Sequence, residues 1–221
     1  MASPSRSSPT PRIPLSRERV LDAALSVADR EGIEAMTMRR LAQELGVEAM
    51  TIYYHVPNKE QILDGMVARV MGEIELPERG EPWKPAIRRM ALSARDTLAR
   101  HPWATGRMMT GGLTAERLRY MESILGCFRA GGFTAYQTHL AYHAIESHIV
   151  GFTLWLAGMN LPADLSELAS DVMRQVSADD YPAFIEHIEE HLREPRETDV
   201  GTFEFGLDLI LDGLERMLRD S

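Results

Sequence analysis

A run of polar and aromatic side chains lies between residues 51 and 59, and the types of these side chains suit contact with a nucleic acid. Hydroxyl and imidazole groups exchange hydrogen bonds with phosphate oxygens and base edges. A lysine at the start of a helix can share one phosphate with the N-terminal amides of that helix. Their types and spacing predict a surface that contacts DNA. The side chains are Thr51, Tyr53, Tyr54, His55 and Lys59.

Two short helices that meet at a tight turn are expected to position this surface. Thr37 can cap the first helix, and Gly46 lies where the turn needs a glycine. Ala42 is small enough for the two helices to touch there, and the second helix is expected from about residue 48 to residue 55. The pattern favours a helix-turn-helix. The alternative is a helical hairpin whose polar face is merely solvated.

One further helix is expected on each side of this motif. Ser16 can cap the preceding helix, which ends at Gly32, and Asn58 can cap the following one. The N-terminal residues are rich in Ser and Pro and cannot bury enough apolar surface to fold, so we expect a flexible arm there. The predicted domains are the arm (1–14), a helix-turn-helix DNA-binding domain (15–62), and a ligand-binding and dimerisation domain (63–221).

The rest of the chain is also expected to be helical. No segment alternates apolar and polar residues with a period of two between hairpin turns, so strands are not expected. We therefore predict an all-α fold of about nine or ten helices. The breaks between the later helices are expected at 77–83, 105–112, 131–132, 159–164, 177–182 and 194–196.

The helix-turn-helix region resembles the signature of the TetR family of transcriptional regulators in the stretch TMRRLAQELGVEAMTIYYHVPNKEQIL. The preceding LSRERVLDAALSVADREGIEAM is similar to the first helix of that family, and the similarity continues from Trp83 to about Gly158. The resemblance implies an N-terminal three-helix DNA-binding domain and a larger helical domain. It also favours a repressor. The methionine and tryptophan side chains of the larger domain predict that a small, largely apolar or aromatic molecule releases it, and a two-fold dimer predicts a palindromic operator.

Individual roles at the DNA surface follow from the same resemblance. It implies that Arg39 contacts a base, that Thr51, Tyr53 and Lys59 hold phosphates, and that four residues lie along the base edges. Those four are Ala49, Met50, Tyr54 and His55. The family's type member has glutamine and proline where this chain has Ala49 and Met50. Loss of an amide that can grip adenine predicts a different operator sequence.

Two C-terminal segments repeat glycine at a spacing of seven residues. Glycine inside a helix costs up to about 1 kcal/mol, so repeated glycines on one face suggest that two helices approach closely. The resemblance implies that both helices pair with their symmetry mates in a homodimer. The alternative is close packing within one subunit. The predicted interface consists of Gly151, Gly158, Phe203, Gly206, Ile210, Gly213 and Met217.

A ligand site is expected along one helix of the larger domain. Four polar side chains there recur at i, i+3, i+4 and i+7 and so share a face, which can either line a ligand cavity or belong to the core. They are His139, Tyr142, His143 and Glu146. Soft apolar side chains are expected to complete the lining, although each of them can equally belong to the core. These are Trp103, Met108, Met121 and Trp155.

The same four-residue face also permits a metal site, since two histidines and a carboxylate are possible ligands. The spacing is loose, however, and no second cluster completes the set. The resemblance places the family's drug-bound magnesium ligands opposite Met108 and Trp155, and neither side chain replaces a hard-cation ligand. We therefore expect no metal and no cofactor.

Composition bounds the remaining possibilities. The net charge is −9, but residues 1–59 carry eight Lys or Arg against seven Asp or Glu, and the remainder carries 16 against 26. A near-neutral head on an acidic body suits a small DNA-binding domain. The single cysteine, Cys127, and the lack of an apolar run or signal core favour a cytoplasmic protein away from membranes. The rival classes are an enzyme, for which no G-x-S-x-G motif occurs, and a helical protein-interaction module.

Overall fold

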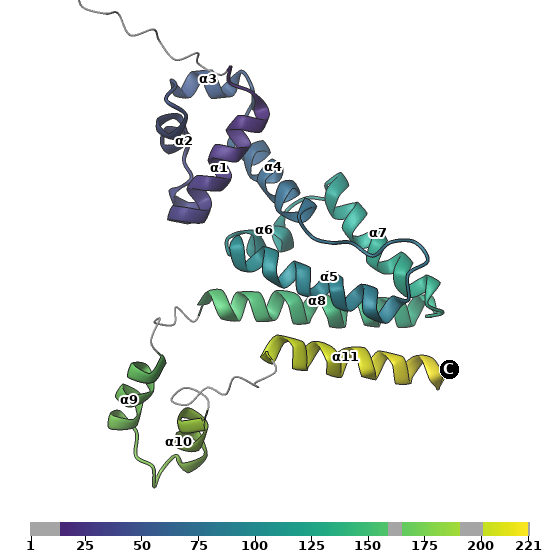
Figure 1. Cartoon of the computed structure of the whole chain (residues 1–221). Coiled ribbons are helices and arrows are strands. Elements are labelled where there is room, and N and C mark those ends of the chain that lie inside the picture. The colour runs from purple at the N-terminus through teal and green to yellow at the C-terminus, as the bar shows by residue number, and fades with distance from the viewer. Residues whose placement is uncertain (1–13, 159–164, 191–200, 221) are drawn as a thin grey trace, which may run out of the picture. The chain divides into compact units, whose positions relative to one another are not determined.

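The computed structural model describes residues 14–158, 165–190 and 201–220 (Figure 1). Every regular element within these residues is helical, which confirms the all-α prediction. One 3₁₀ turn, Ile33–Ala35, follows the first helix. The helices are α1 (Arg17–Glu31), α2 (Met38–Leu45), α3 (Ala49–Tyr53), α4 (Lys59–Gly72), α5 (Trp83–Arg100), α6 (Ala104–Thr110), α7 (Ala115–Ala130), α8 (Ala135–Gly158), α9 (Leu165–Gln175), α10 (Pro182–Ile188) and α11 (Thr202–Arg219).

The described residues hold eleven α-helices, one more than the upper number expected, and the main difference is α6. The stretch 105–112 was expected to be a break because it carries three glycines, yet α6 occupies most of it. Arg107 and two methionines between the glycines are good helix formers, and they outweigh the glycine cost over a short helix. The break at 177–182 is confirmed, whereas those at 159–164 and 194–196 lie outside the described residues.

Local capping sets the helix starts where the sequence predicts them. The side chain of Ser16 accepts a hydrogen bond from the Arg19 amide, and Thr37 accepts one from the Arg40 amide. Asn58 accepts one from the Gln61 amide at the start of α4. Each bond satisfies a helix N–H group that otherwise lacks a partner.

The chain forms two compact units that divide after Arg69, inside α4. The domain boundary expected after residue 62 falls in the same helix. In unit 1, α1 packs on α2, and α2 packs on α3. The predicted arm lies outside the described residues except for Pro14. No helix in the described residues is both long and apolar enough to cross a bilayer.

In unit 2, α8 contacts α5, α6, α7 and α11, and α11 also contacts α5. Figure 1 shows α5, α8 and α11 running alongside one another. Ion pairs tie α5 to α11 along their length, with Lys84 on Asp212 and Arg88 on Asp208, both at 2.7 Å. Arg95 also pairs with Glu204 at the start of α11. α11 is therefore fixed to its own subunit by charges on one side and by apolar burial on another.

An aromatic cluster closes the end of the unit where α5 begins and α7 ends. The Trp83 ring lies edge-on to Phe133, with the ring centroids 5.0 Å apart, and Phe128 joins them. Gly131 lies directly under the indole, since a Cβ there would come within 2.7 Å of Trp83 Cδ1. Trp83 can therefore pack in this position only because Gly131 has no side chain.

We predict that Gly131→Ala destabilises unit 2 by about 1–3 kcal/mol, because the added methyl group overpacks the cluster. Gly126→Ala is the matched control. Gly126 is a glycine inside α7 whose Cβ would meet nothing within 4 Å. That change should stabilise the helix by up to about 1 kcal/mol. Urea unfolding followed by circular dichroism measures both, and equal effects of the two substitutions would contradict this packing argument.

Candidate DNA-binding and ligand-binding sites

The turn between α2 and α3 has the geometry of a helix-turn-helix. Gly46 adopts the left-handed conformation at φ 64°, which a side chain would disfavour, and its N–H donates to the Ala42 carbonyl. The Val47 N–H donates to the same carbonyl at 3.1 Å. Ile52 and Val56 are fully buried, and Ala42 is nearly so. The buried side of α3 is thereby fixed, and its other side is left facing solvent.

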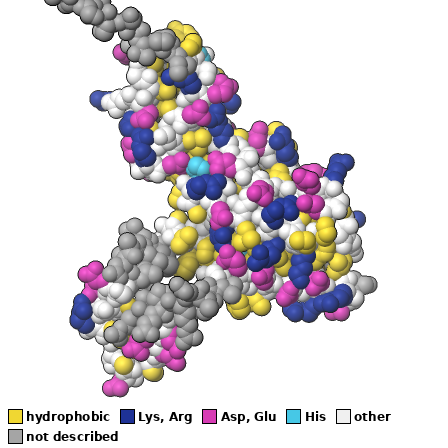
Figure 2. Space-filling view, in the orientation of Figure 1, with side chains coloured by type: hydrophobic (Ala, Val, Ile, Leu, Met, Phe, Trp, Pro, Cys, Tyr) yellow, Lys and Arg dark blue, Asp and Glu magenta, His cyan; other side chains and the backbone are white. Residues whose placement is uncertain are grey.

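The predicted DNA-contact residues all keep accessible surface in unit 1. The most exposed is Tyr54, at 87% of its full surface, followed by Met50 at 68% and Tyr53 at 40%. Arg39 and Lys59 are exposed, while Ala49, Thr51 and His55 are half-buried. Figure 2 shows hydrophobic side chains gathered at the end of unit 1 that carries α3. Exposed large apolar side chains beside polar ones mark a surface that binds a partner.

A network of four charged residues holds α1 to α2 on another side of unit 1. Arg40 pairs with Glu31 at 2.6 Å and with Glu44 at 2.9 Å, and Arg30 pairs with Glu44 at 3.1 Å. Hydrogen bonds from Arg40 and Arg30 lower the pKa of Glu31 and Glu44. Arg40 therefore helps to hold α1 against α2, whereas its neighbour Arg39 makes no ion pair within the described residues.

The four polar residues that were predicted to share one face of α8 differ in their exposure. His139 and His143 are exposed, with their ring centroids 4.5 Å apart. Glu146 is half-buried and accepts a 2.6 Å hydrogen bond from the Tyr120 hydroxyl of α7. Tyr142 is half-buried, and burial together with the Glu146 charge raises its pKa to about 12. The structure therefore brings the carboxylate and the phenol into the unit but leaves both imidazoles outside.

The apolar residues predicted to line a ligand site also differ in burial. Trp103, Met108 and Met121 are half-buried, whereas Trp155 is 53% exposed. Thr105 on α6 lies 3.5 Å from Thr153 on α8, hydroxyl to hydroxyl. α6 therefore contacts the helix that also carries Tyr142 and Glu146.

The predicted dimer residues fall on different sides of α8 and α11. Gly151 and Gly158 are exposed on α8, but Phe203 is buried inside its own subunit, where its carbonyl lies 2.8 Å from His148 Nε2. A Cβ at Gly206 would come within 2.6 Å of the same imidazole. The close approach at Gly206 is thus made within one chain. The other α11 residues, Ile210, Gly213 and Met217, are half-buried.

A continuous exposed face runs along both helices. On α8 its members recur every three or four residues, and they are Tyr136, Leu140, His143, Ser147, Gly151, Leu154 and Gly158. On α11 the exposed large apolar residues are Phe205 at 61% and Leu209 at 56%. Exposed large apolar side chains on two neighbouring helices, here Tyr136, Leu140 and Leu154 on α8 with Phe205 and Leu209 on α11, are a feature of interfaces between subunits.

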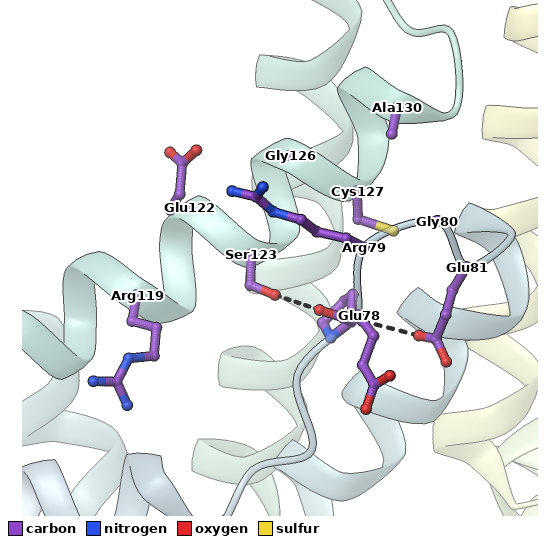
Figure 3. Close-up of a pocket in the computed structure, with 11 residues that line it drawn as sticks. Glu78, Arg79, Gly80, Glu81, Arg119, Glu122, Ser123, Gly126, Cys127 and Ala130 are labelled. Carbon is purple, nitrogen blue, oxygen red and sulfur yellow. Dashed lines mark hydrogen bonds between the residues drawn. The ribbon is translucent and has the colours of Figure 1, made fainter.

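A cavity of about 580 Å³ lies elsewhere in unit 2, between the loop 77–81 and α7 (Figure 3). Ser123 Oγ donates to the Pro77 carbonyl at 2.8 Å, which holds the loop beside the helix. In the close-up, Arg79 extends from the loop toward Gly126 and Cys127. None of the predicted ligand-binding residues lines this cavity. Within the described residues, no three His, Cys, Asp or Glu side chains gather to hold a metal ion.

The all-α fold and the exposed helix-turn-helix define a DNA-binding regulator of transcription. The comparisons agree unit by unit. Residues 20–66 match the family described as bacterial regulatory proteins, tetR family, and residues 76–218 match the tetracyclin repressor-like C-terminal domain. The second match covers more than half of the chain, and the chain belongs to the TetR family. It is therefore a transcriptional regulator rather than an enzyme.

Similar proteins of known role share most of the chain. The HTH-type transcriptional repressor DrrR1 of Streptomyces coeruleorubidus is 33% identical over 95% of this chain and 81% of its own length. The class D tetracycline repressor of Escherichia coli is 33% identical over 63% of this chain, which spans 66% of that repressor. The Streptomyces coelicolor TetR family protein ActR, solved in complex with actinorhodin, has the same fold, with a TM-score of 0.72 at 24% identity over 93% of this chain and 99% of that one.

The structure adds residues that sequence reasoning did not select. Tyr120 was overlooked because its partner Glu146 lies 26 residues away on another helix. Phe205 and Leu209 were overlooked because α11 carries large apolar residues on both its buried and its exposed sides, so the glycine spacing pointed to a neighbouring stripe. The buried edge of α11, which includes Phe203, was distinguishable only once α5 and α8 were in place.

The charge network predicts how acid destabilises unit 1. A carboxylate whose pKa is lowered by folding stabilises the fold above its unfolded pKa, about 4.3 for Glu, and loses that contribution as pH falls through the folded pKa. Glu44→Gln should therefore unfold at lower denaturant concentration than wild type at neutral pH. The difference should close below about pH 4.

Denaturant midpoints measured across this pH range test the prediction. Glu34→Gln is the control, because Glu34 is an exposed carboxylate that makes no ion pair within the described residues. It should behave as wild type throughout. A difference between wild type and Glu44→Gln that stayed constant into acid would show that the network does not stabilise unit 1.

Proposed function

We propose that this protein is a repressor that binds a palindromic operator as a homodimer and leaves it when a small, largely apolar or aromatic molecule binds unit 2. The observation that carries the proposal is the exposed outer side of α3 on a helix-turn-helix that matches the TetR family. The relative DrrR1 is named a transcriptional repressor, which supports repression over activation.

At the DNA, α3 enters the major groove with its exposed side toward the bases. Arg39 contacts a base from α2, and Lys59 holds a phosphate from the start of α4. Thr51 and Tyr53 hold further phosphates, and Ala49, Met50, Tyr54 and His55 lie along the base edges. The burial of Ile52 and Val56 on the opposite side of this segment supports the assignment, because it leaves those side chains pointing outward.

The dimer forms through the exposed face of α8 and α11. Leu140, Leu154, Phe205 and Leu209 are large apolar side chains that a second copy would remove from water. Gly151 and Gly158 on the same face allow close approach of the partner helix. A two-fold dimer places its two recognition helices about 34–36 Å apart, one turn of B-DNA, and so matches a palindromic site.

The ligand lies against α6, α7 and α8. Tyr142 and Glu146 face it from α8, and Trp103, Met108 and Met121 supply apolar contact. His139, His143 and Trp155 are exposed in one subunit, and we place them where the second subunit completes the site. That ActR was solved with a small molecule bound supports ligand binding by this fold. A tenfold release of the operator requires about 1.4 kcal/mol of preference for the released conformer.

The function is tested by electrophoretic mobility of DNA from the region upstream of the gene. Purified protein should retard one fragment as a dimer, and a member of a panel of hydrophobic metabolites should relieve the retardation. Absence of retardation of any upstream fragment would contradict the proposed function.

DNA contacts should divide by chemical type. Lys59→Ala removes a phosphate partner, so it should weaken binding to all sequences alike and lower the salt slope by roughly one unit. Arg39→Ala should cost about 1–3 kcal/mol and relax the preference at one base pair in each half-site. Binding isotherms at several salt concentrations, on the operator and on single-base variants, measure both effects.

Arg40→Ala is the matched control, because its guanidinium is held by Glu31 and Glu44. It should leave the salt slope unchanged. If Arg39→Ala and Lys59→Ala shared one sequence profile and one salt slope, the assignment of these two roles would be wrong.

Charged residues introduced into the proposed dimer interface should prevent dimerisation. Phe205→Glu with Leu209→Glu places two carboxylates in the apolar face, so sedimentation should show monomers and operator affinity should fall at least about tenfold. Leu118→Glu is the control, since Leu118 is a similarly exposed leucine on α7, at 50%. A dimeric double variant with unchanged affinity would place the interface elsewhere.

A further inference from the structure

The carboxylate of Glu146 is only partly satisfied. Its side chain is half-buried on α8, a helix that contacts α7, and burial raises its pKa because an anion is less stable away from water. The Tyr120 hydroxyl donates to Oε1 at 2.6 Å. Among the described residues this is the only hydrogen bond that the carboxylate accepts. A carboxylate has room for about four.

The groups around this carboxylate do not neutralise it by contact. Arg117 acts on it at a distance, but the guanidinium of Arg117 donates to the Gly111 carbonyl at 2.7 Å. Tyr142, one turn earlier on α8, keeps its proton at neutral pH because its pKa is raised to about 12. Tyr120 is buried, and its hydroxyl lies 3.8 Å from Met90 Sδ. The site therefore holds an anion with two neutral phenols and a thioether beside it.

Partial burial beside neutral groups weakens the hydration of this carboxylate, and one hydrogen bond from a phenol offsets that loss only in part. Oε2 still has accessible surface, because among the described residues the buried side-chain polar atom without a partner is Thr138 Oγ1. A half-buried carboxylate with one open oxygen, next to the proposed ligand contacts, favours a binding role.

We propose that Glu146 and Tyr120 form the polar end of the ligand site and select a small aromatic molecule that carries a protonated amine. The inference rests on the proposed function and names its ligand class. A carboxylate only accepts hydrogen bonds, so the ligand supplies the donor. The carboxylate is an anion without a contacting cation, so the best donor carries positive charge. Tyr120 holds Oε1, which leaves Oε2 for the ligand.

The test compares two probes of the same shape and different charge, 2-naphthylmethylamine and 2-naphthylmethanol. Isothermal titration of each into the full-length protein gives two affinities. The wild type should bind the amine at least about tenfold more tightly than the alcohol, as expected for one charge-assisted hydrogen bond.

Glu146→Gln keeps the size and the acceptor but removes the charge, so the two affinities should converge to within about twofold. Glu122→Gln is the control. Glu122 is an exposed carboxylate on α7, the helix that carries Tyr120, and its variant should keep the preference. Tyr120→Phe should also keep the preference, because the carboxylate remains.

A measurement on wild type alone covers the case in which Glu146→Gln does not fold. Acidification protonates Glu146 at its raised pKa, so affinity for the amine should fall while affinity for the alcohol stays constant. The groups that act on Glu146 within the described residues are Tyr120 and Arg117 of α7, with Tyr142 beside it on α8. Tyr120 and Tyr142 keep their protons over this range, because the pKa of each is raised.

A wild type without preference for the amine overturns the inference, as does a preference that survives in Glu146→Gln or that does not weaken in acid. Operator retardation is measured on the same preparations. Retardation without amine preference removes this inference alone, whereas loss of retardation removes the proposed function.

Discussion

Burial of one side of α8 is the interaction on which unit 2 depends. This helix contacts α5, α6, α7 and α11, and its fully buried residues include Ala141, Ile145 and Ile149. Because an α-helix has 3.6 residues per turn, satisfying four neighbours on one side still leaves a complete outer stripe. That stripe holds Leu140 and Leu154, which no helix of the same subunit covers within the described residues. Burial of one side of α8 therefore both builds the core of unit 2 and leaves exposed the side that we propose as the dimer interface.

In unit 1, too, burial of one side of a helix leaves its other side exposed. The left-handed turn at Gly46 sets the direction of α3, and Ile52 and Val56 then commit one side of it to the core. Tyr53, the last residue of α3, and Tyr54, which follows it, remain exposed. Exposed aromatic side chains are costly in water, and their position here is a result of core packing elsewhere in unit 1.

The sequence alone was enough to predict the structural features that depend on residues close together in the chain. The helix caps and the turn between α2 and α3 depend on residues only a few positions apart, so the sequence pattern is enough to predict them. These are the caps at Ser16, Thr37 and Asn58 and the turn at Gly46. The division of the α8 face was not predicted, because His143 and Glu146 have similar helical positions and only the placement of α7 separates them. The choice of face on α11 depended likewise on charged residues of α5 more than a hundred positions away.

The charge distribution makes dimerisation necessary for DNA binding as proposed here. Residues 1–59 carry eight Lys or Arg against seven Asp or Glu, and carboxylates in the same unit hold Arg30 and Arg40. The six other cations of this segment face seven carboxylates, so one head gains little from displacing counterions from phosphates, which is the term that dominates non-specific affinity. The acidic remainder of the chain adds repulsion. On the proposed function a single head would bind DNA weakly, and useful affinity would come from two heads held at the spacing of one operator, so that the second binds at high effective concentration.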